Sequence, residues 1–451
     1  YPPVEGLSGN MAVDAEQLRM TAVRALCGPI RLTGQDLLIT QWATDPHVDV
    51  KIRGAAPLAG LVETVRRLDD FPLLRDLAAE FEQPTGDAEM VAHVMGRPLS
   101  GQPLALVDAD LRLVRGGGRS AFLPAPVRQV EAHVTVTPTL VAIEHLDGRL
   151  GPAAFEAEGA VTMVDGRAYS NVTLTMSLEA SEAQSWWAGQ ADEEFIPEMD
   201  GTIRLRAAVT GVIGHSRIKG RVDLGQAGLR LNNWFTKPPQ APAAIDFEGQ
   251  LSREHRLVIR HVGIGLPPVT ITGSGTIDLN GDRAFSVHVS SGRIAVGRLP
   301  KGIVLGPVRA GTFAASLDMN GRMNDRASWR TAGQITFDEG ALKVEQLDEP
   351  IKDAFVTLRF DQDRIDIPRM AFRLGASDFR ITGAIAQWAD QPRARLVVES
   401  SQIDLAALAL SGARPSRAAR HRPSDPFWAD ATLNAFVFAD HVYYKKFLLT
   451  D

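Results

Sequence analysis

The chain has 451 residues, of which 45% are hydrophobic and 23% charged, so its composition is that of a folded protein and excludes wholesale disorder. Its formal net charge of -6 argues against a general nucleic-acid binder, which carries a basic excess. The single cysteine, Cys27, excludes an internal disulfide, and the sequence contains no apolar run of about 18 residues that would predict a membrane span. It opens with YPPVEG and closes with KKFLLTD, and we expect both ends to be cut from a longer protein.

The first distinctive segment in chain order is residues 57–82, where apolar residues follow helical spacing. Leu58, Leu61 and Val65 fall on one helical face, and Pro72 suits the first turn of a second helix. The segment therefore predicts a pair of short amphipathic helices. A weaker helix or loop is expected over 181–198.

Most of the remaining chain alternates apolar and polar residues with a period of two, the pattern of strands with one apolar face. The clearest alternating positions are Val134 and Val136, Val172, Leu174 and Met176, Ile203 and Leu205, Val287 and Val289, and Val356, Leu358 and Phe360. Dipeptides that suit tight hairpins recur at Asp147-Gly148, Asp165-Gly166, Asn280-Gly281 and Asn320-Gly321. The sequence thus predicts a mostly antiparallel sheet with turns at these dipeptides.

One phrase occurs three times, at 150–159, 264–273 and 374–383. Each copy begins with Leu or Ile followed by glycine, continues with alternating residues and ends in a second glycine. A glycine inside a strand permits a sharp bend or a close approach of two backbones. We therefore expect repeated bends in the sheet at Gly159, Gly273 and Gly383.

A set of strands that is apolar on one face cannot bury that face by itself, so neighbouring sets must stack into one continuous apolar surface. The phrase that occurs three times therefore predicts a repeat protein. We expect an all-β, elongated, curved sheet that forms a taco-like groove. The predicted units are an N-terminal strand unit at 1–100 with the helical pair, repeat units at 101–200, 201–300 and 301–410, a linker at 411–426, and the start of a truncated unit at 427–451.

Catalytic and ligand-binding signatures are weak. The GHSRI segment at 214–218 lacks the final glycine of a nucleophile elbow, and GSGTID at 273–278 lacks the helix that follows a phosphate loop. The ten histidines do not show metal-ligand spacing. We therefore expect no enzyme, no cofactor and no metal site, and we interpret the arginines of 411–424 as a solvated linker.

Several longer stretches carry a resemblance to a known family. They are YPPVEGLSGNMAVDAEQLRM, LTGQDLLITQWATDPHVDVKIRGAAPLAGLVETV, ALKVEQLDEPIKDAFVTLRFDQDRIDIPRMAFRLGASDFRITGAI and ARLVVESSQIDLAAL. With them, nearly the whole chain resembles the AsmA-like family of bacterial envelope proteins, and within it the large YhdP-type members.

The resemblance implies a long curved sheet with an apolar interior, held in the periplasm by an N-terminal inner-membrane helix. It implies transport of phospholipids between the inner and outer membranes, outer-membrane biogenesis as the process, possible envelope protein partners at both missing ends, and no catalytic residues.

The alternating residues agree with that picture on physical grounds. An apolar groove accepts acyl chains by non-directional burial, at about 0.8 kcal/mol per methylene. The residues expected to line it are Val134, Val136, Phe155, Val269, Ile271, Val356, Leu358, Phe360, Phe379 and Ile381.

Two other functions fit the same pattern. A periplasmic assembly factor or chaperone would offer sheet edges to outer-membrane proteins and bind peptide strands. A closed-core β scaffold would pack the same apolar residues against a facing sheet.

Overall fold

A computed structural model describes most of the chain. The described residues are 4–33, 36–41, 44–66, 78–79, 81–120, 123, 125–187, 198–232, 235–252, 254, 256–279, 283–323, 325–344, 347–387, 392–406, 432–444 and 447–449. The predicted linker at 411–426, the turn at Asn280-Gly281 and most of the second predicted helix lie outside the described residues.

The chain divides into two compact units. Unit 1 comprises residues 1–182 and 204–220, and unit 2 comprises residues 183–203 and 221–451. The division passes within α3 (Ala180–Trp187), β12 (Glu198–Val212) and β13 (His215–Asp223). The predicted repeat units are shorter than these compact units and stay a prediction.

Unit 1 is built from long strands joined mainly by short turns. They are β1 (Val4–Val13), β2 (Gln17–Cys27), β3 (Ile30–Thr33), β4 (Asp36–Thr40), β5 (His47–Pro57), β6 (Glu82–Arg97), β7 (Gln102–Arg119), β8 (Val127–Val136), β9 (Leu140–Leu150), β10 (Ala153–Val164) and β11 (Arg167–Glu179). β2 pairs with β1, β3 and β4, and β5 pairs with β3 and β4. From β5 to β11 each strand pairs antiparallel with the next.

Helix α1 (Leu58–Arg66) connects to β5 without a break, and a 3-10 turn η1 (Pro98–Ser100) joins β6 to β7. The first predicted helix is therefore confirmed. Residues 78–79 are also helical, and the chain enters β6 at Glu82.

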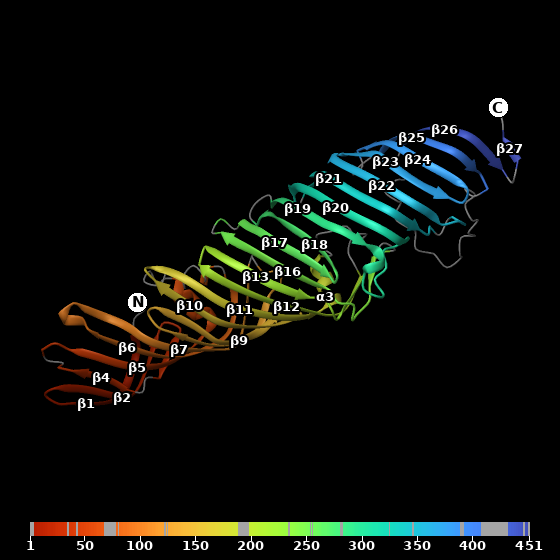
Figure 1. The fold of residues 1–451 in the computed structure, drawn as a ribbon. Coiled ribbons are helices and arrows are strands. Elements are labelled where there is room, and N and C mark those ends of the chain that lie inside the picture. Colours follow the sequence, from red (N-terminus) through yellow and green to blue (C-terminus); the bar gives the residue numbers. More distant parts are fainter. Residues whose placement is uncertain are drawn as a thin grey trace. The chain divides into compact units, whose positions relative to one another are not determined.

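Unit 2 continues the same architecture. Its elements are β14 (Ala227–Leu231), β15 (Phe235–Lys237), β16 (Ala244–Ser252), β17 (Arg256–Leu266), β18 (Val269–Asp278), β19 (Ala284–Ala295), η3 (Val296–Arg298), β20 (Val308–Arg322), β21 (Asp325–Leu342), β22 (Ile351–Gln362), β23 (Arg364–Leu374), β24 (Ser377–Ala386), β25 (Arg393–Asp404), β26 (Thr432–Tyr444) and β27 (Phe447–Leu449). From β16 to β25 each strand pairs antiparallel with its successor, and Figure 1 shows β17 to β24 side by side in chain order.

One pairing in unit 2 breaks the antiparallel rule. β26 lies parallel to β25, with Arg393 opposite Thr432 and Asp404 opposite Tyr443. Parallel neighbours need a long crossover connection, and the 27 residues from 405 to 431 lie between these two strands in sequence.

A small second sheet accompanies the main one. It joins residues 198–201 of β12 to β14 and β15, and Lys237 on β15 is buried there. The Lys237 Nζ donates hydrogen bonds to the carbonyls of Ala227 and Pro238. Burial lowers the pKa of Lys237, and the charges of Asp223 and Asp200 oppose that shift.

The fold class is confirmed: within each unit the described residues form an all-β, mostly antiparallel sheet with few helices. Asp165-Gly166 forms the β10–β11 turn as predicted, with φ values of 49° and 71°. The turns predicted at Asp147-Gly148 and Asn320-Gly321 are wrong, because these pairs lie inside β9 and β20. An added Cβ at Gly148 would lie 3.0 Å from Phe155 Cζ, so this glycine serves packing instead of a turn.

Candidate functional site: the apolar face of the sheet

The strand register of unit 2 places apolar residues directly opposite one another across many strands. Three rows result, and together they are called the apolar face of unit 2. Row A runs over β19–β25 through Ile294, Phe313, Phe337, Val356, Met370, Ile381 and Val398. Row B runs over β16–β22 through Ile245, Ile264, Ile271, Ser291, Ala315, Ile335 and Leu358. Row C runs over β16–β25 through Phe247, Val262, Gly273, Val289, Leu317, Gly333, Phe360, Ile365, Ile385 and Ala394.

The opposite face of the same strands is polar. One of its rows consists of Thr272, Ser290, Ser316, Gln334, Arg359, Asp366, Ala384 and Arg395. Side chains alternate between the two faces of a strand. The sheet is therefore polar on one face and apolar on the other.

The apolar face of unit 2 is not a closed core. Among the residues of rows A, B and C only Ile294 is buried, at 3% relative exposure; Ile264 is exposed and the others are half-buried. A closed sandwich would bury most such residues. Cross-strand neighbours cover part of each side chain and leave the remainder accessible.

One buried apolar cluster among the described residues of unit 2 lies where strands begin or end. Leu374, Phe379 and Ile403 are buried together at the β23–β24 turn and the end of β25. The rings of Phe372 and Phe379 lie 5.1 Å apart between centroids. This cluster anchors one end of the strands beside row A.

The sequence-predicted residues of unit 2 fall at three kinds of place. Ile271, Val356, Leu358, Phe360 and Ile381 lie in the rows of the apolar face. Phe379 belongs to the closed cluster just described. Val269 is buried at the start of β18, opposite Leu266.

Sequence reasoning missed Met370, although it stands between Val356 and Ile381 in row A. The cause is a register shift in β23 between Ile367 and Met370, which breaks the two-residue period. A signal existed in Pro368, because proline inside a strand marks a bulge. Arg369, at the same irregularity, stacks over Phe355 at 4.3 Å from the ring centroid.

Unit 1 repeats the pattern with smaller side chains, and its rows define the apolar face of unit 1. One row contains Ala56, Ala88, Leu113, Ala132, Leu146, Ala157 and Leu174. The next contains Gly54, Met90, Leu111, Val134, Ile143, Gly159 and Val172, and a third contains Ile52, Ala92, Ala109, Val136, Val141, Val161 and Ser170. Of the predicted residues, Val134 and Val136 lie in these rows, and Phe155 lies opposite Gly148 and Met176.

Helix α1 packs on the apolar face of unit 1. Leu61 lines a small apolar pocket together with Ile30, Ala56, Ala88 and Met90. A Cβ added at Gly60 would lie 2.5 Å from the Pro29 Cβ, so only glycine allows this close packing. The helix therefore lies on the apolar side of the unit 1 sheet. The sequence alone did not predict on which side of the sheet it would pack.

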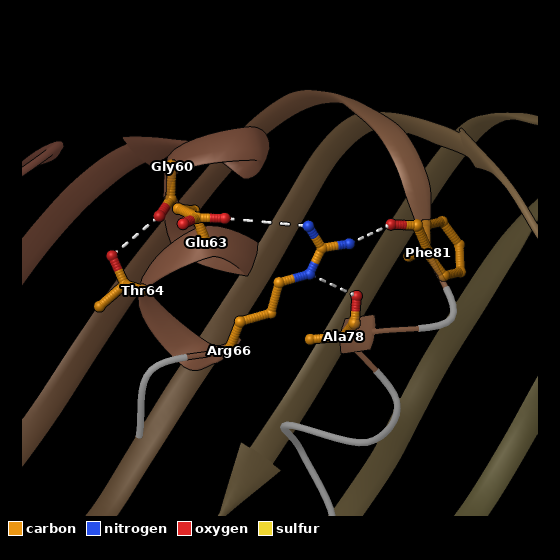
Figure 2. Close-up of polar contacts among 6 residues, drawn as sticks. All are labelled: Gly60, Glu63, Thr64, Arg66, Ala78 and Phe81. Atoms are coloured by element: carbon orange, nitrogen blue, oxygen red, sulfur yellow. Dashed lines mark hydrogen bonds and ion pairs between the residues drawn. The ribbon is translucent and has the colours of Figure 1, made fainter. Parts of the chain in front are cut away.

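A side-chain clamp holds the end of α1 (Figure 2). The Arg66 guanidinium donates hydrogen bonds to the backbone oxygens of Ala78 and Phe81, at 3.1 and 2.7 Å, and lies 3.8 Å from Glu63. The Phe81 ring in turn covers Gly118 on β7, where an added Cβ would lie 2.6 Å from the ring. Arg66 thus ties the helix to the segment that re-enters the sheet.

The repeated glycines behave differently in the three copies. Gly159 and Gly383 have φ values of 141° and 149°, and an added Cβ would overlap the carbonyl oxygens of Asn171 and Arg395. These two glycines allow close approach to the neighbouring strand, as expected. Gly273 does not share this geometry; in the middle copy Gly275 takes the role, with an added Cβ overlapping the carbonyl oxygen of Ser286.

Histidine and carboxylate side chains on the sheet form short cross-strand contacts. His93 lies 2.9 Å from Asp49 and His133 lies 2.9 Å from both Asp110 and Glu144. The hydrogen bond from the Ser401 hydroxyl, at 2.6 Å, holds the pKa of Asp378 below its ordinary value, helped by the backbone N–H of Gln402.

Within the part of the chain that the structure describes, no cluster of three or more His, Cys, Asp or Glu side chains could hold a metal ion. A search of the described helices finds none that is both long and apolar enough to span a bilayer. Comparisons with family models, with curated proteins and with solved structures gave no match.

Proposed function

We propose that this chain is a non-catalytic lipid-carrying segment of the bacterial envelope, whose apolar faces conduct phospholipid acyl chains between the inner and outer membranes. In the full-length protein it would be anchored to the inner membrane and lie in the periplasm. The observation that carries the proposal is the partial exposure of rows A, B and C over ten consecutive strands, β16 to β25.

Apolar side chains that stay partly accessible over ten strands favour an interaction with a partner. Contiguous apolar patches above a few hundred Å² on a protein surface mark interaction sites. Acyl chains suit this surface because their burial is non-directional, and the rows offer Val, Ile, Leu, Phe and Met side chains without a fixed pattern of donors and acceptors. The resemblance to AsmA-like proteins supports the same partner.

Lipid analysis of the purified chain tests the proposal. Native mass spectrometry followed by organic extraction should find several phospholipids on each wild-type chain. Ile381→Asp places a carboxylate in row A, and Leu358→Asp places one in row B. Each variant should lose most of that lipid, because burying a charge against acyl chains is costly.

The matched control is Thr382→Asp, which places the same charge on the next residue of β24. Thr382 is exposed and belongs to the opposite face, so this variant should keep its lipid. Circular dichroism and protease resistance should be the same for all variants. A lipid-free wild-type chain, or unfolding of the Ile381→Asp and Leu358→Asp chains, would contradict the proposal and favour a closed core; co-purifying peptide in place of lipid would favour an assembly factor.

A further inference from the structure

A pocket of about 240 Å³ lies at one end of the strands in unit 2. Its lining combines apolar side chains, Val269 and Ile294, with two arginines, Arg293 and Arg298. Val269 and Ile294 are buried at 7% and 3% exposure, so the apolar part of the lining is fixed by the fold.

The pocket exists because two neighbouring strands separate. The register between β18 and β19 ends at the pair Ile271–Ser291, although β18 begins two residues earlier and β19 continues to Ala295. On its other side β19 shifts register against β20 between Ser291 and Ile294. The irregularity opens a fork in the sheet, and η3 follows it with Arg298 as its last residue.

The two arginines differ in whether a carboxylate lies close enough to balance their charge. Arg293 lies 3.2 Å from Asp338 on β21, so that carboxylate balances much of its charge. Arg298 is exposed, and no described carboxylate lies within ion-pair distance of it. The pocket therefore has one uncompensated guanidinium, the group best suited to bind the oxygens of a phosphate.

The size and position of the pocket indicate which parts of a ligand it could hold. Sites that enclose a whole drug-sized ligand measure roughly 300–1,000 Å³, so this pocket fits a head group only. Ile294 is also the first residue of row A, which crosses six strand spacings of about 4.8 Å each, or roughly 29 Å. The acyl chains of one membrane leaflet span about 15 Å, so row A is long enough to hold them.

We propose that this pocket binds the phosphate of an amphiphile, with Arg298 on the phosphate and the acyl chains on row A. The inference rests on the proposed function and adds a head-group preference to it: phosphate-bearing lipids are held at the β18–β19 fork more tightly than neutral ones. Arg293, fixed by Asp338, forms the second wall of the head-group site.

Three probes added to the full chain test the inference: dihexanoyl-phosphatidylglycerol, dihexanoylglycerol, and inorganic phosphate alone. Calorimetric titration should show that the wild type binds the phosphorylated amphiphile about tenfold more tightly than the neutral one, as expected for one charge-assisted contact. Arg298→Gln should reduce that preference to about twofold or less.

The control is Arg256→Gln, which removes one exposed arginine at the far end of the β17–β18 hairpin, opposite Asp278. It should keep the tenfold preference. Equal binding of both amphiphiles to the wild type, or equal losses in the two variants, would refute the head-group site while leaving the lipid-carrying proposal standing. Competition by inorganic phosphate at the same concentration as the phosphorylated amphiphile would also refute it, because the site would then bind a free anion. If neither amphiphile binds, both proposals fail.

Discussion

Replacing Gly383 by alanine should weaken the pairing of β24 with β25. Gly383 has φ near 149°, and a Cβ there would overlap the backbone oxygen of Arg395. Holding a non-glycine residue in such a conformation costs on the order of 1–3 kcal/mol. The overlap adds to that cost, since the oxygen belongs to backbone and the strands must separate to relieve it.

Hydrogen exchange measures this effect locally, which matters because long repeat arrays do not unfold in one step. A cost of about 1–3 kcal/mol increases the open population about 5- to 150-fold, so amides of β24 and β25 should exchange faster by that factor. Strands β16 to β18 should exchange as in the wild type.

Gly265→Ala provides the control from the middle copy of the same repeat. Its added Cβ would have one neighbour, the Ala244 oxygen at 3.8 Å, and its backbone is not left-handed. This variant should leave exchange rates unchanged or slightly slower, since alanine restricts the unfolded chain. Equal acceleration in Gly383→Ala and Gly265→Ala would refute the reasoning that the repeat glycines serve close strand approach.

Two further predictions concern other parts of the fold. Gly60→Val should push α1 away from Pro29 and raise exchange in Leu58–Arg66 without affecting β24 or β25; unchanged exchange in the helix would show that its packing does not depend on this contact. Asp378→Ala should speed amide exchange in β24 and β25, compared with the wild type at the same pH, at about pH 7 but much less at about pH 2.5. A carboxylate with a lowered pKa stabilises the fold at pH values above its ordinary pKa of 3.8, and that contribution is lost as the pH falls through the lowered pKa. A ratio of exchange rates that stays the same at both pH values would show that the Asp378 charge does not matter.

Alternation in the sequence was sufficient to predict the strands and to divide their residues between two faces. Val134, Val136, Val356, Leu358 and Phe360 all lie in rows of the apolar faces. The period of two reports which residues share a face because side chains alternate along any strand. It carries no information on what covers that face.

Glycine was the least reliable signal, because a strand uses it for several purposes. Gly166 forms a turn, Gly148 makes room for the Phe155 ring, and Gly383 lets two backbones approach. All three follow or lie within alternating segments, so the sequence does not separate them. Their roles depend on the residue opposite, which only the register reveals.

The parallel pairing of β26 with β25 was also beyond sequence reasoning. Strand direction depends on the path of the connection, and apolar alternation reads the same in either direction. The proposed head-group pocket could not be predicted from the sequence either, because it depends on strand register. Val269 and Arg298 are 29 positions apart, and they line the same pocket because the pairing of β18 with β19 ends early.

A lipid carrier requires acyl chains to move easily along the apolar face, whereas a head-group site holds a lipid at one position. The depth of the free-energy well at that site decides whether the two functions are compatible. Rows of similar side chains make neighbouring positions nearly equal in energy, so an acyl chain can move along them without a large barrier. A head-group site adds a well at one position. A tenfold preference corresponds to about 1.4 kcal/mol, so the well slows departure only about tenfold. Arg298 would therefore set where a phosphate-bearing lipid pauses on row A without trapping it, whereas a site with several buried charges would bind too tightly for a carrier.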